Sequence, residues 1–201
     1  IMSSDWSSDV CSSDLYDGPF ELLIATILSA QCTDERVNQT TPELFEKYPD
    51  AESMAEADPE DIREIIQSLG FYNQKTKSVM GCCRALVEEH GGQVPDDMDA
   101  LTEIRGVGRK TASVVLAGAF DRQAIPVDTH VKRVSTRLGL AGGKNADKIE
   151  QQLRKVLPED RWSRGAMLIG THGRRICHSR KPDCQNCPVS HLCDYYARQN
   201  D

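Results

Sequence analysis

The stretch "LTEIRGVGRKTASVVLAGAF", residues 101–120, places two helix-forming segments on either side of a Gly-Val-Gly turn. The first segment is predicted to end at Ile104 and the second to begin near Arg109. Glycines in the turn permit positive φ and leave no Cβ to block a close approach. The amides of the turn and of the new helix then point outward together, as in sites that bind phosphate. The stretch therefore predicts a DNA-binding helix–hairpin–helix element, rather than a plain turn between helices, with contacts from Gly106, Val107, Gly108 and Arg109.

Lys110 follows directly, in the first turn of the second predicted helix. A surface lysine is ordinarily a solvated charge or a phosphate contact. A helix N-terminus disfavours a cation, however, and so favours the neutral amine. A neutral amine is what a Schiff-base nucleophile requires. Lys110 is therefore a candidate catalytic nucleophile.

The segment "IPVDTHVKRV", residues 125–134, places Asp128 at the start of another predicted helix. An aspartate there can be simply an N-cap. The helix also carries Lys132, Arg133 and Arg137, so the carboxylate lies beside a basic surface. A carboxylate near a nucleophilic amine can assist the departure of a base and stabilise positive charge on a sugar. Asp128 is therefore the second candidate catalytic residue.

The rest of the chain predicts an all-α protein, because apolar residues recur at intervals of three and four from Pro19 onward. Asp58 and Pro59 begin one helix, which Gly70 follows, and another runs from Asn73 to the Gly91-Gly92 pair. Further helical segments are predicted at residues 33–48, 98–104, 109–120, 128–138, 146–156 and 162–172.

The charge of the chain is unevenly distributed. The formal net charge is −7, yet residues 105–183 contain 17 Lys and Arg against 7 Asp and Glu, a balance of +10. An acidic part and a basic part suggest a polyanion bound to one face. The basic candidates for phosphate contacts are Lys132, Arg133, Arg174, Arg175, Arg180 and Lys181. The longest apolar run, residues 20–30, is too short to cross a bilayer, so we expect a buried helix there and no membrane partner. The first residues lack the basic and apolar segments of a secretory signal, so we expect a cytoplasmic protein.

Eight cysteines in such a chain favour metal binding over disulfides. Four of them, Cys177, Cys184, Cys187 and Cys193, lie in "CHSRKPDCQNCPVSHLC" with six, two and five residues between them. This spacing alone leaves zinc, an iron–sulfur cluster and disulfides open. Cys82 and Cys83 lie inside a predicted helix and are expected to be buried thiols.

The first residues repeat Ser-Ser-Asp three times, from Ser3 to Leu15. Nothing in this stretch has a core-forming period, and its composition suits disorder. We expect residues 1–18 to be non-native or disordered, and we exclude them from the fold argument.

The order of "LLIATILSAQCTDERVN", "GFYNQKTK", "IRGVGRKTASVVL", "VDTHVKRV" and the cysteine run resembles the endonuclease III family of base-excision DNA repair glycosylases. The resemblance covers about residues 19–196. It implies an all-α, two-domain helix–hairpin–helix glycosylase fold. A six-helix barrel domain at residues 19–122 would precede a [4Fe-4S] cluster domain at residues 123–201.

The resemblance also implies an activity: removal of oxidised pyrimidines from duplex DNA, followed by cleavage of the abasic site through β-elimination. Lys110 matches the lysine that attacks C1′ of the deoxyribose, and Asp128 matches the essential carboxylate. Gln31 matches the residue that fills the gap left by a flipped base, and Phe71 stands where an intercalating Leu is common. The remaining implied sites are DNA contacts at His130, Arg180 and Lys181 and cluster ligands at Cys177, Cys184, Cys187 and Cys193.

Three alternatives stay open at this point. An adenine-type mismatch glycosylase shares the hairpin and the cysteine spacing, but its group lacks the hairpin lysine and needs a further C-terminal domain. A non-catalytic DNA-binding module with zinc, or a ferredoxin-like electron carrier, would explain the cysteines without Lys110. The preferred prediction is a monomer that acts on double-stranded DNA with an oxidised pyrimidine or an abasic site, in the cytoplasm and, in a bacterium, associated with the nucleoid.

Overall fold

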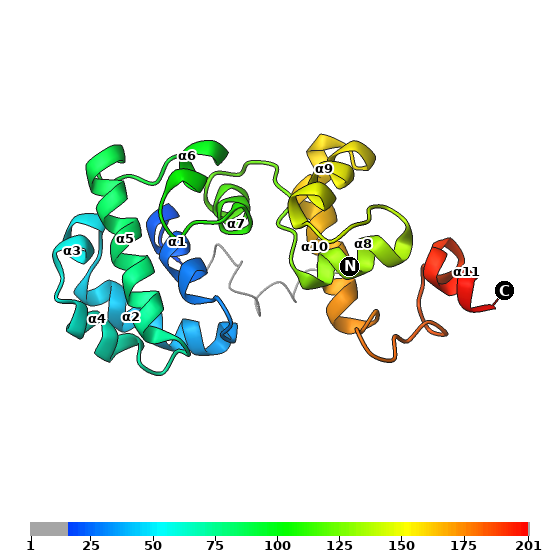
Figure 1. Ribbon diagram of the computed structural model, residues 1–201, viewed down its shortest axis with the longest axis horizontal. Coiled ribbons are helices and arrows are strands. Elements are labelled where there is room, and N and C mark those ends of the chain that lie inside the picture. Colours follow the sequence, from blue (N-terminus) through cyan, green and yellow to red (C-terminus); the bar gives the residue numbers. More distant parts are fainter. Residues whose placement is uncertain (1–15, 201) are drawn as a thin grey trace. The chain divides into compact units, whose positions relative to one another are not determined.

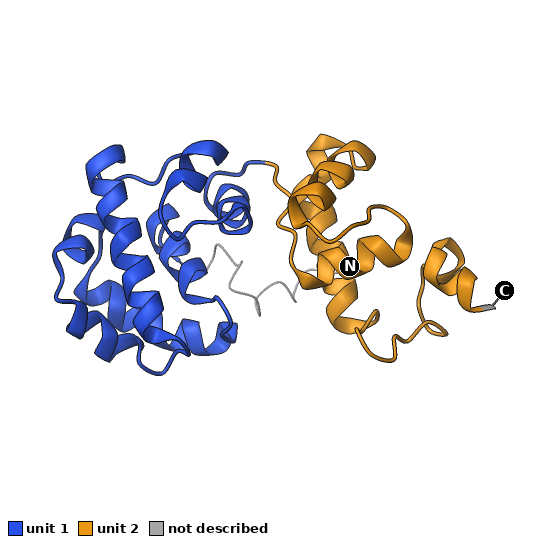
Figure 2. Ribbon diagram, in the orientation of Figure 1, with its two compact units in different colours: residues 1–122 blue, residues 123–201 orange. Residues whose placement is uncertain are grey.

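The computed structural model describes residues 16–200, and these form helices and turns without a strand. The boundary between two compact units falls between Arg122 and Gln123 (Figure 2). The Ser-Ser-Asp repeats lie outside the described residues. No helix in the described part of the chain is long and apolar enough to span a membrane.

The first unit contains α1 to α7 (Figure 1). Their bounds are α1 Pro19–Leu28, α2 Asp34–Lys47, α3 Ala51–Glu56, α4 Pro59–Ile66, α5 Tyr72–His90, α6 Met98–Glu103 and α7 Arg109–Ala119. Helix α1 is the centre of this unit, since every residue from Leu22 to Leu28 is buried. It packs against α2, α5 and α7. The apolar run expected to form a buried helix therefore does so.

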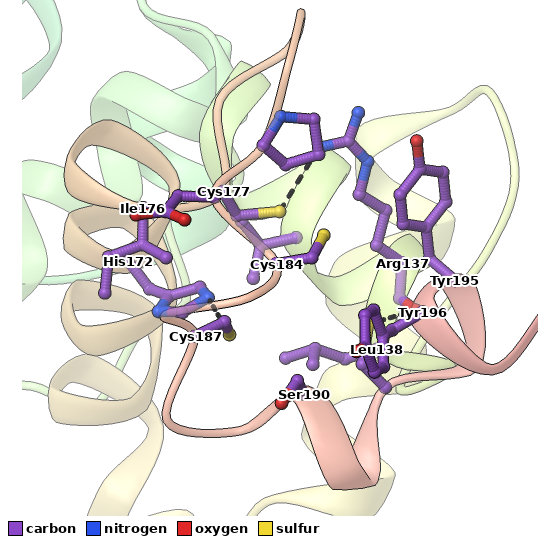
Figure 3. Close-up of a pocket in the computed structure, with 14 residues that line it drawn as sticks. Arg137, Leu138, His172, Ile176, Cys177, Cys184, Cys187, Ser190, Tyr195 and Tyr196 are labelled. Atoms are coloured by element: carbon purple, nitrogen blue, oxygen red, sulfur yellow. Dashed lines mark hydrogen bonds between the residues drawn. The ribbon is translucent and has the colours of Figure 1, made fainter. Parts of the chain in front are cut away.

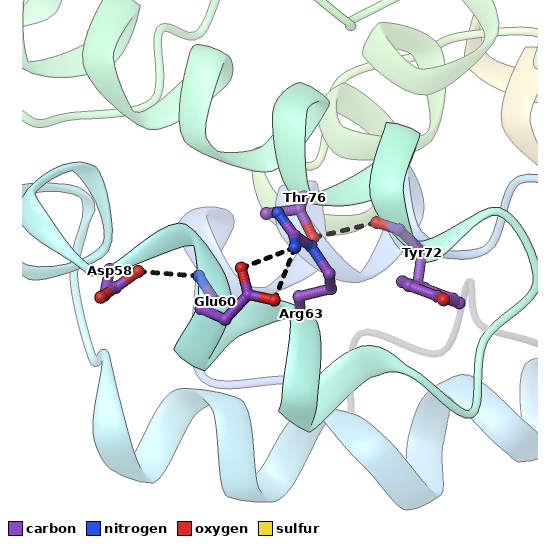
Figure 4. A network of polar contacts seen from close by, with 5 residues as sticks. All are labelled: Asp58, Glu60, Arg63, Tyr72 and Thr76. Carbon is purple, nitrogen blue, oxygen red and sulfur yellow. Dashed lines mark hydrogen bonds and ion pairs between the residues drawn. The ribbon is translucent and has the colours of Figure 1, made fainter.

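Capping residues fix where several of these helices begin. The Asp58 side chain accepts a hydrogen bond from the Glu60 amide at 2.9 Å, with Pro59 at the first helical position. Arg63 pairs with Glu60 one turn later, and the Thr76 hydroxyl donates to the Tyr72 carbonyl on α5 (Figure 4). Helix α4 ends at Ile66, earlier than Gly70 suggested, because the chain turns there and buries Leu69 completely.

The second unit contains α8 Thr129–Leu138, α9 Ala146–Val156, α10 Trp162–Arg175 and α11 Asp194–Asn200, with 3-10 turns η2 Glu159–Arg161 and η3 Ser190–Leu192. Its core joins α8, α9 and α10 through apolar residues that include Val131, Val134, Ile149 and Leu153. Gly173 lets α10 pass close to α8, because a Cβ there would meet Val134 Cγ2 at 3.0 Å. This packing places the N-terminus of α8 and the C-terminal end of α10 in one rigid frame.

Candidate functional site

The hairpin between α6 and α7 has the expected form. Ile104 and Val107 are buried, and the Val107 amide donates to the Ile104 carbonyl at 3.0 Å. Gly106 has φ +91°, and a Cβ there would lie 3.3 Å from Ser78 Cβ. Gly108, by contrast, has an ordinary φ of −90°, and a Cβ there would meet nothing within 4 Å. Only Gly106 therefore needs positive φ, while Gly108 keeps the outer side of the turn open.

Lys110 is the second residue of α7, and its side chain is exposed. The opposite face of α7 is buried at Ala112, Val115 and Leu116, and the helix packs against α1. The first turn of α7 is thus held by the core of the first unit while Lys110 projects to solvent. An amine in this position is both accessible to a ligand and close to the positive end of a helix dipole.

Four non-glycine residues of the described chain have positive φ, and three of them are predicted DNA contacts: Gln31, Phe71 and Lys181. Such backbone conformations are uncommon and tend to persist where a function requires them. Gln31 lies exposed after α1, and Phe71 precedes α5 with 69% of its surface exposed. An exposed phenylalanine held in a strained backbone conformation is suited to insertion between bases.

Asp128 is the N-cap of α8, and its Oδ1 accepts a hydrogen bond from the Val131 amide at 2.7 Å. Its Oδ2 lies 3.7 Å from Nη2 of Arg174, near the end of α10. The carboxylate is mostly buried, with 19% of the side chain exposed. Asp128 thus combines the capping role with an ion pair. The sequence identified Arg174 only as a phosphate candidate.

Besides Arg174, two more of the expected basic contacts are used inside the second unit. Arg133 donates to the carbonyls of Cys177 at 3.0 Å and Gly173 at 2.8 Å. Its Nη2 also lies 3.1 Å from Nδ1 of His130, and since a guanidinium only donates, that nitrogen is the acceptor. The ammonium of Lys132 donates to the Lys144 carbonyl. Arg180 and Lys181, by contrast, are exposed and have no ion-pair partner among the described residues.

The four clustered cysteines line one pocket in the second unit (Figure 3). Each is half-buried, and none forms a disulfide. Burial and the proximity of Cys177, Cys193 and Cys187 raise the pKa of the Cys184 thiol, so four thiolates in this space need a cation to offset their charge. Arg137, His172, Tyr195 and Tyr196 complete much of the wall.

This arrangement fits an iron–sulfur cluster. No group of three or more His, Cys, Asp or Glu within residues 16–200 converges closely enough to hold a single metal ion. A zinc site would bring four sulfurs to about 2.3 Å from one point. A [4Fe-4S] cluster instead takes one thiolate at each iron, so its ligands surround a space.

The comparisons with known proteins agree with this geometry. Residues 24–159 match the model of the HhH-GPD superfamily base excision DNA repair proteins, and residues 177–193 match the iron–sulfur binding domain of endonuclease III. Hairpin, helices and cysteine cavity thus define a base excision repair protein with an iron–sulfur domain. The chain is 49% identical to endonuclease III of Synechocystis sp. over 96% of this chain and 88% of that protein. It belongs to the endonuclease III family.

Two further relatives support this assignment. Endonuclease III of Escherichia coli is 43% identical over 90% of this chain and 85% of that protein. A solved structure of a trapped covalent intermediate of endonuclease III with DNA superposes with a TM-score of 0.85. It is 41% identical and covers 92% of this chain and 88% of that one.

Family membership decides between the alternatives that the sequence left open. The chain is an enzyme of base excision repair, a DNA glycosylase with abasic-site lyase activity, and its cofactor is a [4Fe-4S] cluster. The all-α fold with an iron–sulfur binding domain, expected from the resemblance, is confirmed. The zinc module, the electron carrier and the adenine-type glycosylase are thereby set aside.

Proposed function

We propose that the chain removes oxidised pyrimidines from duplex DNA and then cleaves the abasic strand, with Lys110 as the nucleophile. The observation that carries the proposal is the exposed position of Lys110 at the start of α7, directly after the hairpin. A related endonuclease III has been trapped in a covalent intermediate with DNA. A lysine amine is a nucleophile that can form such an intermediate, as a Schiff base with the sugar.

In this proposal the neutral amine of Lys110 attacks C1′ of the damaged nucleoside, and the bond from C1′ to the base breaks. The base leaves with the bonding electrons and is protonated. Loss of the amine proton and opening of the sugar give an imine between Nζ and C1′. Removal of a proton from C2′ then expels the 3′ phosphate by β-elimination, and water hydrolyses the imine to free Lys110.

Asp128 is proposed as the carboxylate that stabilises positive charge on the sugar as the base departs. The hydrogen bond from the Val131 amide and the contact with Arg174 hold the half-buried carboxylate in one orientation. A fixed charge of this kind needs no reorganisation during the reaction. We assign cluster ligation to Cys177, Cys184, Cys187 and Cys193. When bound, the cluster supplies a rigid cross-link for the loop that carries Arg180 and Lys181, with no part in bond breaking.

The remaining residues are proposed as DNA contacts. The amides of Gly106, Val107, Gly108 and Arg109 bind a phosphate at the hairpin. Gln31 fills the space left by the flipped base, and Phe71 inserts beside its former partner. The imidazole ring of His130 contacts the DNA, and the charged groups of Arg180 and Lys181 bind the phosphate backbone of the DNA.

Reductive trapping tests the proposed function. The full-length holoenzyme is incubated with a thymine-glycol duplex and sodium borohydride, which reduces an imine to a stable amine. We expect a covalent protein–DNA adduct on a denaturing gel, and none with undamaged duplex. An adduct formed only with an adenine–8-oxoguanine duplex, or none with any duplex, would overturn the proposal.

The salt dependence of DNA binding should show whether Arg180 and Lys181, in the loop between the first two cysteines, contact phosphates. Each phosphate contact contributes about 0.9 to the slope of log K against log salt concentration. We expect the double variant Arg180→Gln/Lys181→Gln to reduce that slope by roughly 1.8. Lys47→Gln removes a lysine that pairs with Asp61 on the first unit, and should leave the slope unchanged. Equal slopes for the wild type and the double variant would remove both residues from the DNA interface.

We also propose that the enzyme acts as a monomer on chromosomal DNA in the cytoplasm, associated with the nucleoid in a bacterium. The relatives named above are bacterial. Analytical ultracentrifugation of the holoenzyme with and without a lesion duplex tests the first point. The chain has a mass of 22.3 kDa, and twice that mass for the free enzyme would contradict the proposal of a monomer.

A further inference from the structure

Arg137 connects helix α8 to the beginning of the cysteine segment. It lies in the last turn of α8, and its Nη1 donates to Cys177 Sγ at 3.2 Å (Figure 3). The same nitrogen donates to the His178 carbonyl at 2.7 Å. Its Nη2 donates to the Ser179 carbonyl at 3.1 Å. One guanidinium therefore holds three consecutive residues, the first of which is a cysteine of the cavity.

The same residue also contacts the end of the segment. The guanidinium lies over the ring of Tyr195, 4.6 Å from the ring centroid. The thiol of Cys193 lies 3.3 Å from the Arg137 carbonyl oxygen. Arg137 thus reaches both the first and the last cysteine of the run, and the aromatic ring fixes the plane in which its donors point.

A hydrogen bond to a ligand sulfur has a defined effect on an iron–sulfur cluster. The sulfur carries more negative charge when the cluster gains an electron, so an N–H donor stabilises the reduced form more and raises the reduction potential. A guanidinium donor is charged at every accessible pH. Because the cysteines are only half-buried, a side chain that covers a sulfur also slows the access of water and chelators.

We propose that Arg137 sets the one-electron reduction potential of the [4Fe-4S] cluster and protects its Cys177 ligand. Arg137 is a positioning residue in this proposal, and its effect passes through the sulfur and the loop backbone. The proposal rests on the assignment of Cys177 as a cluster ligand. It is independent of the roles proposed for Lys110 and Asp128.

The test uses the full-length holoenzyme and compares Arg137→Gln with the wild type. Voltammetry at a carbon electrode should give a more negative potential for the variant. In the presence of an iron chelator, the visible cluster absorbance of the variant should be lost about tenfold faster. Loss of a contact that supports a metal ligand typically costs about 10- to 100-fold in metal affinity, and we expect the lower end of that range. Arg198→Gln removes an equally positive, exposed side chain of α11 and should change neither quantity.

Two further variants keep the outcome decisive. Arg137→Lys keeps the charge but loses the planar fork, so its potential and bleaching rate should fall between those of the wild type and the Gln variant. Tyr195→Leu keeps the N–H donors of Arg137 and should change the potential and the bleaching rate less than Arg137→Gln does. If the Arg137→Gln protein assembles no cluster, the same two measurements on the Arg137→Lys protein test the proposal. A variant with full iron content and wild-type potential and bleaching would overturn the role of Arg137.

The ligand assignment has its own readout. Cys177→Ala should lose iron and visible absorbance on purification, because one thiolate per iron is required. A Cys177→Ala protein with unchanged iron content and bleaching would show that the assignment had failed, independently of Arg137.

Discussion

Replacement of Lys110 by glutamine should abolish the borohydride-trapped adduct and lower base excision and strand cleavage by roughly 10³-fold or more. Glutamine has a length and polarity similar to lysine, but its amide nitrogen has no nucleophilic lone pair. Because Lys110 is exposed at the start of α7, the change should alter the free energy of unfolding by about 0.5 kcal/mol or less. Affinity for a lesion duplex should survive, because the hairpin amides remain.

A matched control separates nucleophilicity from charge. Lys148 is also an exposed lysine in the first turn of a helix, α9, but no hairpin precedes it. Lys148→Gln should trap like the wild type in a single-turnover assay with a thymine-glycol duplex. If Lys110→Gln still formed the adduct, another amine would be the nucleophile. If it lost DNA binding as well, Lys110 would be a phosphate contact.

The helices that were predictable from the sequence are those with strong local signals. Asp58 and Pro59 fix the start of α4, and Gly91 ends α5 in a left-handed conformation. Helix α10 runs one turn beyond the predicted end near His172, because Gly173 serves a close helix crossing there and does not terminate the helix. Local sequence does not distinguish these two uses of glycine.

Short helices were missed for a related reason. Helix α3 has only six residues, and its start depends on a capping box between Asp50 and Ser53 that is visible only once the hydrogen bonds are known. Helix α11 has seven residues and directly follows the cysteine run, whose spacing indicates metal ligands and gives no sign of a helix. Neither has enough turns for an apolar period to emerge.

Within the site, the sequence identified the chemically distinctive residues but not their supports. Arg137 lies 40 residues from Cys177 in the chain, and only the packing of α8 brings them together. The pairing of Arg174 with Asp128 likewise depends on the crossing of α8 and α10. Burial is a further property that the local sequence does not reveal, as Lys75 shows. Its side chain is buried with no hydrogen-bond partner for Nζ, and burial lowers its pKa. The residues around it in the sequence do not distinguish it from a surface lysine.

Replacement of Asp128 by asparagine should separate the two roles that one carboxylate combines. Asparagine caps a helix about as well as aspartate, so the bond from the Val131 amide and the stability of α8 should be retained. The negative charge is lost, and with it the ion pair to Arg174. Excision of thymine glycol under single-turnover conditions should fall by roughly 10²- to 10³-fold, the range of a lost charge that acts in the transition state.

The reaction itself offers an internal comparison. A preformed abasic site has already lost its base, so its cleavage should fall less than excision does in the Asp128→Asn variant. Asp58→Asn is the matched control, since Asp58 caps α4 with the same kind of side-chain bond. That variant should excise and cleave like the wild type. If Asp128→Asn did so too, Asp128 would be only a helix cap, because a cap needs an acceptor oxygen and not a charge.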